Sequence, residues 1–315
     1  MASSTDPRGI AVLLSLLAAF GWATYYIFVL AISPGTTPSA ILVYPFVFGG
    51  LAYAAWSMVE GHGRAFLAVW LEPAAYVRTA LLVGMQVSVL AATYLTGPVD
   101  AALLSLIGDV VATPLIVAIV LGAHREQVRS PLFAVGLLLS LVGGSMAIAG
   151  GQRITGIHDW GWLIVPAVPL TVAFYFLLTA RANERRPASA VVGQSMLASA
   201  LLSVAISPAV PGGLPGLEGF GAGPLVVLLL TGLSSFFLAP ALYFLALRKV
   251  GLVIPPMLMT GIPVFTLLLS AVVLRLSLPL VAVLGIPVAV GGALLTLRAE
   301  AREEPPANAP VPGRP

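Results

Sequence analysis

A long stretch near the start of the chain carries no charged side chain. No Asp, Glu, Lys, Arg or His lies between Gly9 and Val59. Because about 20 helical residues cross the hydrocarbon core of a bilayer, this stretch is too long for one span. The turn signal Ser33-Pro34-Gly35 divides it into two predicted helices, 10–32 and 39–59. A chain with this feature is predicted to fold inside a lipid bilayer.

The composition extends this prediction to the whole chain. Hydrophobic residues make up 59% and charged residues 9% of the 315 residues, whereas a soluble domain carries about 25% charged residues. We therefore expect an all-α membrane protein with ten transmembrane helices. The eight further spans, separated by charges and Pro/Gly clusters, are 76–96, 98–121, 131–150, 161–180, 188–208, 223–247, 251–274 and 277–297.

Basic residues set the predicted orientation. With the N-terminus in the cytoplasm, 13 of the 15 Lys and Arg residues fall inside, and only Arg153 and Arg275 fall outside. We therefore expect a multi-pass protein of the cell membrane (an inner membrane), with both termini cytoplasmic. The Pro-rich, charged segment 299–315 is predicted to be a disordered cytoplasmic tail.

The chain also aligns with itself at an offset of 149 residues without a gap. The informative matches are Pro38 with Pro187, Tyr26 with Tyr175, and Pro114 with Pro263, because these residue types are not abundant; Gly136 with Gly285 and Gly143 with Gly292 match as well. Residues 1–150 and 151–298 are thus predicted to form two five-helix repeats. Because five is odd, the second repeat is inverted, an arrangement typical of secondary transporters that work by alternating access. A membrane scaffold without transport is the alternative.

Three short motifs carry a family resemblance. They are Phe20-Gly21-Trp22, Ala92-Thr93-Tyr94 followed by Pro114, and Ala241-Leu242-Tyr243 followed by Pro263. With these motifs the chain resembles the drug/metabolite transporter superfamily, in the branch of ten-helix EamA-type exporters, and is similar to bacterial aromatic amino acid exporters. The resemblance implies export of amino acids, with nucleotide sugars or drugs as alternatives. Where the family often places a Glu after the ninth helix, this chain has Arg275.

Asp109 is the one ionisable side chain, tyrosine apart, that is predicted to lie well inside a span. An aspartate at a helix centre costs about 2.5–3.5 kcal/mol on insertion scales, so it should face a cavity or a partner. It is a candidate for proton relay or for binding a substrate ammonium. The alternatives are a hydrogen-bonded packing residue or a place near an aqueous opening. Asp100, near the outer end of the same helix, is predicted to be solvated.

Several uncharged side chains within the spans are further candidates. Trp22 and Tyr26 lie in mid-span, where they can wall a pocket for a flat or apolar substrate or pack in the core. Amides and hydroxyls can hold a substrate or join helices, and those we select are Gln86, Thr171, Ser235 and Thr260. Pro114 and Pro263 are predicted hinges, because a mid-helix proline removes a backbone hydrogen bond.

Other functions lack their motifs. The chain has no cysteine, and His62, His124 and His158 are far apart, so no metal site or cofactor is predicted. No phosphate-binding G-x-x-x-x-G-K-[ST] sequence is present, and an intramembrane enzyme would need a partner for Asp109. We expect a monomer without nucleic-acid partners, exporting small neutral or zwitterionic molecules, with protons as a candidate coupling ion.

Overall fold

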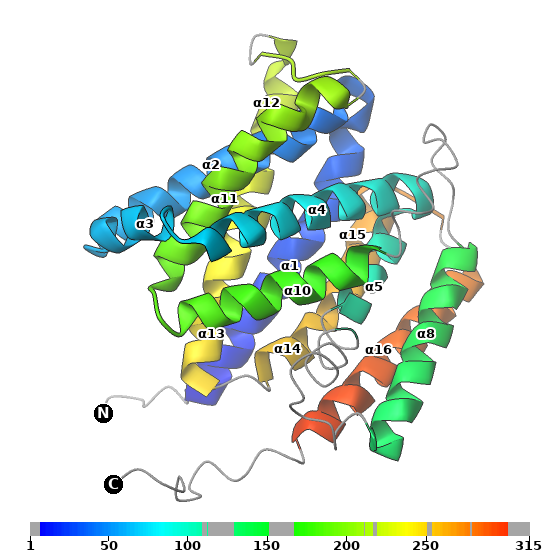
Figure 1. Cartoon of the computed structure of the whole chain (residues 1–315). Coiled ribbons are helices and arrows are strands. Elements are labelled where there is room, and N and C mark those ends of the chain that lie inside the picture. Colours follow the sequence, from blue (N-terminus) through cyan, green and yellow to red (C-terminus); the bar gives the residue numbers. More distant parts are fainter. Residues whose placement is uncertain are drawn as a thin grey trace, which may run out of the picture.

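The computed structural model describes residues 7–108, 112, 129–150, 167–210, 212–216, 219–250, 254–277 and 279–301. The regular elements within these ranges are helical (Figure 1). Those of the first half are α1 (Pro7–Ile32), η1 (Ser33–Gly35), α2 (Pro38–Val59), α3 (Gly63–Val69), α4 (Pro73–Thr96), α5 (Pro98–Ile107) and α8 (Pro131–Gly150). Those of the second half are α10 (Ala167–Asn183), α11 (Ala188–Ile206), η3 (Ser207–Ala209), α12 (Ala222–Thr231), η5 (Gly232–Leu238), α13 (Ala239–Val250), α14 (Ile254–Met259), α15 (Gly261–Val273) and α16 (Leu280–Ala301).

Prolines set several of the helix starts. Pro38, Pro73, Pro98 and Pro131 are each the first residue of a helix, a position where the missing N–H breaks no intrahelical bond. Gly97 alone separates α4 from α5 and has φ 103°, a left-handed conformation that only glycine adopts readily. The sequence therefore fixes an abrupt turn between these two helices.

The helices suit a bilayer. Five segments of the described residues are long and apolar enough to cross a membrane: Gly9–Gly35, Pro38–Val59, Pro73–Thr96, Ala188–Ala209 and Ala222–Lys249. Large apolar side chains on the outside of the bundle, such as Leu138 on α8 and Leu280 on α16, are more than half exposed. Such a surface is stable in lipid and not in water. The chain is a multi-pass helical membrane protein.

The described helices differ from the predicted spans in three places. The short helix α3 lies between the second and third spans, where we predicted only a loop. The predicted span 251–274 is interrupted at Thr260, which separates α14 from α15. Helix α16 continues to Ala301, so the predicted tail begins too early; residues 302–315 lie outside the described residues.

Helix α1 lies at the centre of the packing. It contacts α13, α14, α15 and η5, all from the second half of the chain, while α2 packs along α11 and α4 along α10. Helices α8 and α16 pack along each other at one side of the bundle (Figure 1). The main apolar core draws residues from both halves, so the described helices of the two halves share one core.

A π-helical turn, η5, interrupts the segment between α12 and α13. Pro240 lies two residues after Leu238, the last residue of η5, and has no backbone N–H to donate to the preceding turn. Single π turns inside α-helices are frequent at functional sites. In this chain, η5 packs against α1 and α2 at the middle of the bundle.

Candidate functional site

A small cavity lies where helices from both halves meet at the centre of the bundle. Its volume is about 70 Å³. Its lining residues are Trp22, Tyr25 and Tyr26 of α1, Met85, Gln86 and Val89 of α4, Ser105 of α5, Val172 and Phe176 of α10, Ser235 and Phe236 of η5, and Ile262 of α15. None of these described side chains carries a formal charge at neutral pH. We call this space the central cavity.

Aromatic rings form much of the wall of the central cavity. Trp22 meets Phe176 edge to face, with ring centroids 6.1 Å apart, and Tyr25 packs against Phe236 at 5.7 Å. Tyr25 and Tyr26 lie edge to face at 5.6 Å. Edge-to-face pairs favour fixed ring positions. The cavity therefore presents rigid, flat, apolar faces to whatever enters it.

Four polar side chains interrupt this apolar wall: Tyr26, Gln86, Ser105 and Ser235. The Tyr26 hydroxyl donates to Oγ of Ser105 at 2.9 Å, and the Ser235 hydroxyl donates to the Gly21 carbonyl at 2.7 Å. Gln86 differs, since its buried Oε1 has no hydrogen-bond partner among the described residues. A buried carbonyl oxygen without a donor is unfavourable. It is therefore a natural acceptor for an ammonium or amide group in the cavity.

Four predicted site residues come together at this cavity: Trp22, Tyr26, Gln86 and Ser235. Thr171 is not among the lining residues, and its hydroxyl donates to the Ala167 carbonyl at 2.8 Å within α10. Thr260 is buried at the break between α14 and α15, away from the lining. Pro263 lies in the first turn of α15. Asp109 and Pro114 lie outside the described residues.

Ser235 also belongs to a hydroxyl cluster that joins α1 to η5. Thr24 donates to the Gly21 carbonyl at 2.7 Å, and its Oγ1 lies 3.1 Å from Oγ of Ser234 and 3.2 Å from Oγ of Ser235. A side chain at Gly21 would collide with Cβ of Ala239. The glycine of the Phe20-Gly21-Trp22 motif thus allows the close approach on which the cluster depends.

Two charged residues are buried where the sequence predicted them to be solvated or cytoplasmic. Asp100 is 2% exposed, and its Oδ2 has no hydrogen-bond partner among the described residues. The prediction of a solvated Asp100 is wrong, because α5 begins directly after Gly97 and its first turn packs in the bundle, where Val99 belongs to a core cluster with Ile286 and Ala289 of α16. Arg78, counted among the cytoplasmic charges, is also 2% exposed. The sequence did not predict that Asp100 and Arg78 are buried, because both lie near the ends of predicted spans.

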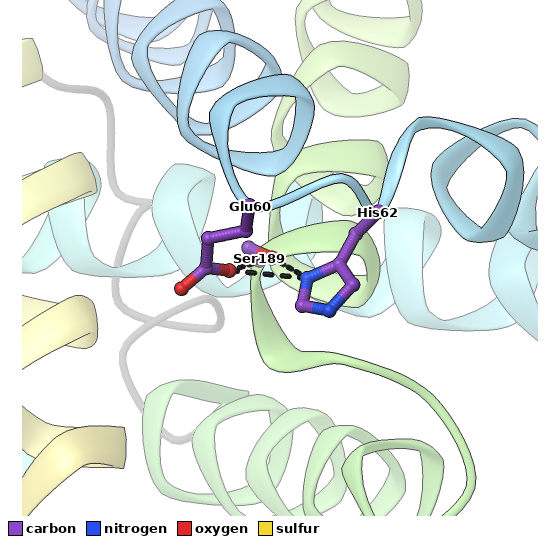
Figure 2. Close-up of polar contacts among 3 residues, drawn as sticks. All are labelled: Glu60, His62 and Ser189. Carbon is purple, nitrogen blue, oxygen red and sulfur yellow. Dashed lines mark hydrogen bonds and ion pairs between the residues drawn. The ribbon is translucent and has the colours of Figure 1, made fainter.

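A serine, a histidine and a glutamate meet at the end of α2 (Figure 2). Ser189 at the start of α11 donates to Oε2 of Glu60 at 3.0 Å, and Nδ1 of His62 lies 3.1 Å from the same oxygen. A hydrolase triad uses opposite ring nitrogens for the serine and the carboxylate. Here Nδ1 faces both groups, at 3.4 Å from the serine. The cluster joins α2 to α11 and does not activate a nucleophile.

Comparisons with known proteins agree with this arrangement. Residues 159–298 match the EamA-like transporter family. The crystal structure of another protein matches the fold with a TM-score of 0.67 at 21% identity, over 93% of this chain and 99% of that chain. At this identity the likeness shows a common fold. No curated protein matches the sequence. Residues 159–298 are therefore similar to the EamA-like transporter family, a likeness that covers the second half of the chain.

Proposed function

We propose that the protein is a secondary transporter that exports small neutral or zwitterionic metabolites, with aromatic and apolar amino acids as its substrates. The observation that carries this proposal is the central cavity. It combines rigid aromatic faces with the unpartnered Oε1 of Gln86, and no described lining residue is charged. Such a lining suits a flat apolar side chain and a donor group better than a polyanion such as a nucleotide sugar.

The size of the cavity supports alternating access. Small-molecule sites occupy about 300–1,000 Å³, and the central cavity measures about 70 Å³. An amino acid therefore fits only after the walls move apart. Two of the lining segments lie beside helix irregularities, η5 itself and the break at Thr260. We propose that these irregularities, with hinges at Pro114 and Pro263, allow the movement.

The contacts between α8 and α16 support an inverted repeat of residues 1–150 and 151–298. A Cβ atom on Gly143 would meet the backbone of Ala289, and one on Gly292 would meet the backbone of Ser140. At the offset of 149 residues, Gly143 corresponds to Gly292 and Ser140 to Ala289, so the two contacts exchange. Helix pairs exchange in the same way: α1 with α13 corresponds to α10 with α4.

Counterflow in proteoliposomes tests the proposed function. Vesicles preloaded with unlabelled phenylalanine should accumulate labelled phenylalanine, tyrosine or tryptophan. Trp22→Leu should weaken this exchange, whereas Trp70→Leu, a tryptophan outside the cavity lining, is the matched control. Exchange of nucleotide sugars without any amino acid would contradict the proposal. Absence of all flux in correctly inserted protein would favour a scaffold.

Proton coupling is a separate part of the proposal. We propose Asp109 as the proton relay or the partner of the substrate ammonium. A carboxylate deep in a span costs free energy of insertion, and such residues usually face a cavity or a charged partner. Asp109→Asn should insert normally and lose the pH dependence of counterflow. If this variant exchanges substrate like the parent at every pH, transport is facilitative or couples elsewhere.

A further inference from the structure

A second cavity opens between α4 and α10, towards the start of α4. Its volume is about 480 Å³, which is within the range of small-molecule sites. Charged residues dominate its polar lining, with four guanidinium groups against one carboxylate: Arg78, Arg181, Arg185, Arg186 and Glu72. We call this space the arginine vestibule. The excess of positive charge favours an anionic group.

Arg78 is the unusual member of the vestibule. Its side chain is buried, and Nε and Nη2 have no hydrogen-bond partner among the described residues. A guanidinium stays charged in proteins, and a buried charge without a partner is costly. Nε and Nη2 share one edge of the guanidinium plane. This edge can hold both oxygens of a carboxylate through two parallel hydrogen bonds.

Glu72 does not supply the missing partner in this structure. Its Oε1 accepts a hydrogen bond from Nε of Arg186 at 3.0 Å, and no described carboxylate lies within 4.0 Å of the Arg78 nitrogens. The side chains of Glu72 and Arg186 are both partly exposed. The ion pair therefore belongs to the solvated part of the vestibule. In the buried part, Nε and Nη2 of Arg78 have no hydrogen-bond acceptor among the described residues, and Glu72 acts on the guanidinium only through its charge.

The vestibule and the central cavity lie along the same two helices. On α4, Arg78 is eight residues before Gln86 and therefore on the same face, about 12 Å away at 1.5 Å per residue. On α10, Phe176 lines the central cavity and Arg181 lines the vestibule. Leu82, between Arg78 and Gln86 on α4, and Thr179, between Phe176 and Arg181 on α10, are buried. A layer of packed side chains thus separates the two spaces.

We propose that the arginine vestibule binds the carboxylate of a small zwitterionic solute, with Arg78 as the residue that holds it. This inference rests on the proposed transport function and specifies a group that the solute must carry. The Nε–Nη2 edge is closed off from solvent here, so it becomes available when α4 and α10 separate. A carboxylate then satisfies Arg78 while Glu72 offers a negative charge to the ammonium.

An anionic lipid carries an oxyanion too, but the vestibule favours a carboxylate. Glu72 lines the same space and repels a second negative charge, whereas it attracts the ammonium of a zwitterion. Basic pockets between transmembrane helices on the cytoplasmic side also bind anionic headgroups, so the lipid source of the oxyanion needs its own test. Nanodiscs made with phosphatidylcholine alone, or with added phosphatidylglycerol, separate the two sources of oxyanion.

Binding to the purified protein is the first test. We expect 3-phenylpropionate to raise the unfolding temperature of the parent in phosphatidylcholine nanodiscs, and phenethylamine to raise it less. Arg78→Gln should weaken 3-phenylpropionate binding about tenfold or more, the usual scale for losing a hydrogen bond to a charged group. Arg78→Lys should be intermediate, because it keeps the charge without the two-pronged edge. Arg64→Gln, an exposed arginine of α3, is the control.

Counterflow separates this inference from the proposed function. Phenylalanine should compete for exchange at least tenfold better than phenylalaninamide in the parent, and this preference should disappear in Arg78→Gln. Exchange of amino acids with an unchanged preference in Arg78→Gln would overturn the carboxylate site alone. Carboxylate binding that depends on Arg78, without any amino acid exchange, would overturn the proposed function alone. Stabilisation by phosphatidylglycerol and not by 3-phenylpropionate would assign the vestibule to lipid.

Discussion

The hydroxyl of Tyr26 on α1 donates a 2.9 Å hydrogen bond to Oγ of Ser105 on α5. Ser105 donates in turn to the Ala101 carbonyl one turn earlier on α5, at 3.0 Å. Both side chains line the central cavity. The bond therefore fixes the separation of two walls at the place where we propose that the substrate binds.

Tyr26→Phe removes this hydroxyl and keeps the ring. We expect the KM for phenylalanine counterflow to rise and the free energy of unfolding to fall by about 1 kcal/mol, the usual net value of a hydrogen bond. Tyr76→Phe is the control, because the exposed Tyr76 hydroxyl bonds the Trp70 carbonyl at 2.9 Å, away from the cavity. Equal transport by both variants would remove Tyr26 from the substrate site.

Gly292→Ala tests the contact between α8 and α16. The added methyl group would meet the backbone and hydroxyl of Ser140, so we expect a loss of about 1–3 kcal/mol of stability. The neighbouring Gly291 has no described atom within 4 Å of an added Cβ. Gly291→Ala should therefore be neutral or slightly stabilising. Thermal unfolding in detergent measures both, and equal unfolding temperatures would contradict the close contact.

Asp100→Asn tests the buried carboxyl group at the start of α5. Removing a charge from a buried site without a described partner should raise the free energy of unfolding at pH 8, by about 1–3 kcal/mol. Glu184→Gln, at an exposed glutamate, should change stability by less than about 0.5 kcal/mol. Thermal unfolding at pH 8 compares them. A strong loss of stability in Asp100→Asn would mean that the carboxylate has a partner outside the described residues.

Ser189→Ala tests the cluster of Figure 2. The variant loses the 3.0 Å hydrogen bond to Oε2 of Glu60, which joins the end of α2 to the start of α11. We expect a loss of about 1 kcal/mol in unfolding free energy with substrate exchange still present. Thermal unfolding and counterflow of the same preparation check this. Abolished exchange at unchanged stability would instead make the cluster part of the transport mechanism.

Single cysteines test the orientation, since the chain has none of its own. Gly35→Cys and Gly216→Cys occupy exposed positions at one end of the molecule and should react with impermeant maleimides from outside the cell. Leu71→Cys and Glu184→Cys are exposed positions at the other end and should react only after permeabilisation. The opposite pattern at both pairs would place the termini outside.

Local sequence signals predicted the helices and part of the central cavity. Prolines, glycines and charged residues mark helix ends independently of tertiary packing. The start of α2 at Pro38 could therefore be predicted to within one residue. Trp22, Tyr26, Gln86 and Ser235 stand out because polar or amphipathic side chains in mid-span need a reason. The sequence did not predict that these four residues line one cavity, because that depends on which helices pack against each other.

Arg78 and Asp100 escaped the sequence analysis for a physical reason. Both lie within a few residues of a helix start. A charged residue near the end of an apolar span is normally predicted to face water. Their burial comes from neighbouring helices that cover these ends, which no local pattern records. The π turn η5 was also missed, although Pro240 lies two residues beyond its end.

The glycine contacts between α8 and α16 have a consequence for how sequences of this kind can diverge. Most positions on these two helices face apolar surroundings, where leucine, isoleucine and valine replace one another at little cost. Gly143 and Gly292 tolerate nothing larger than hydrogen, because the opposing backbone occupies the space. Over long divergence the lipid-facing residues should be substituted freely, while Gly143 and Gly292 should remain glycine. In distant homologues, we expect two glycines 149 residues apart to be retained after the hydrophobic residues around them have changed.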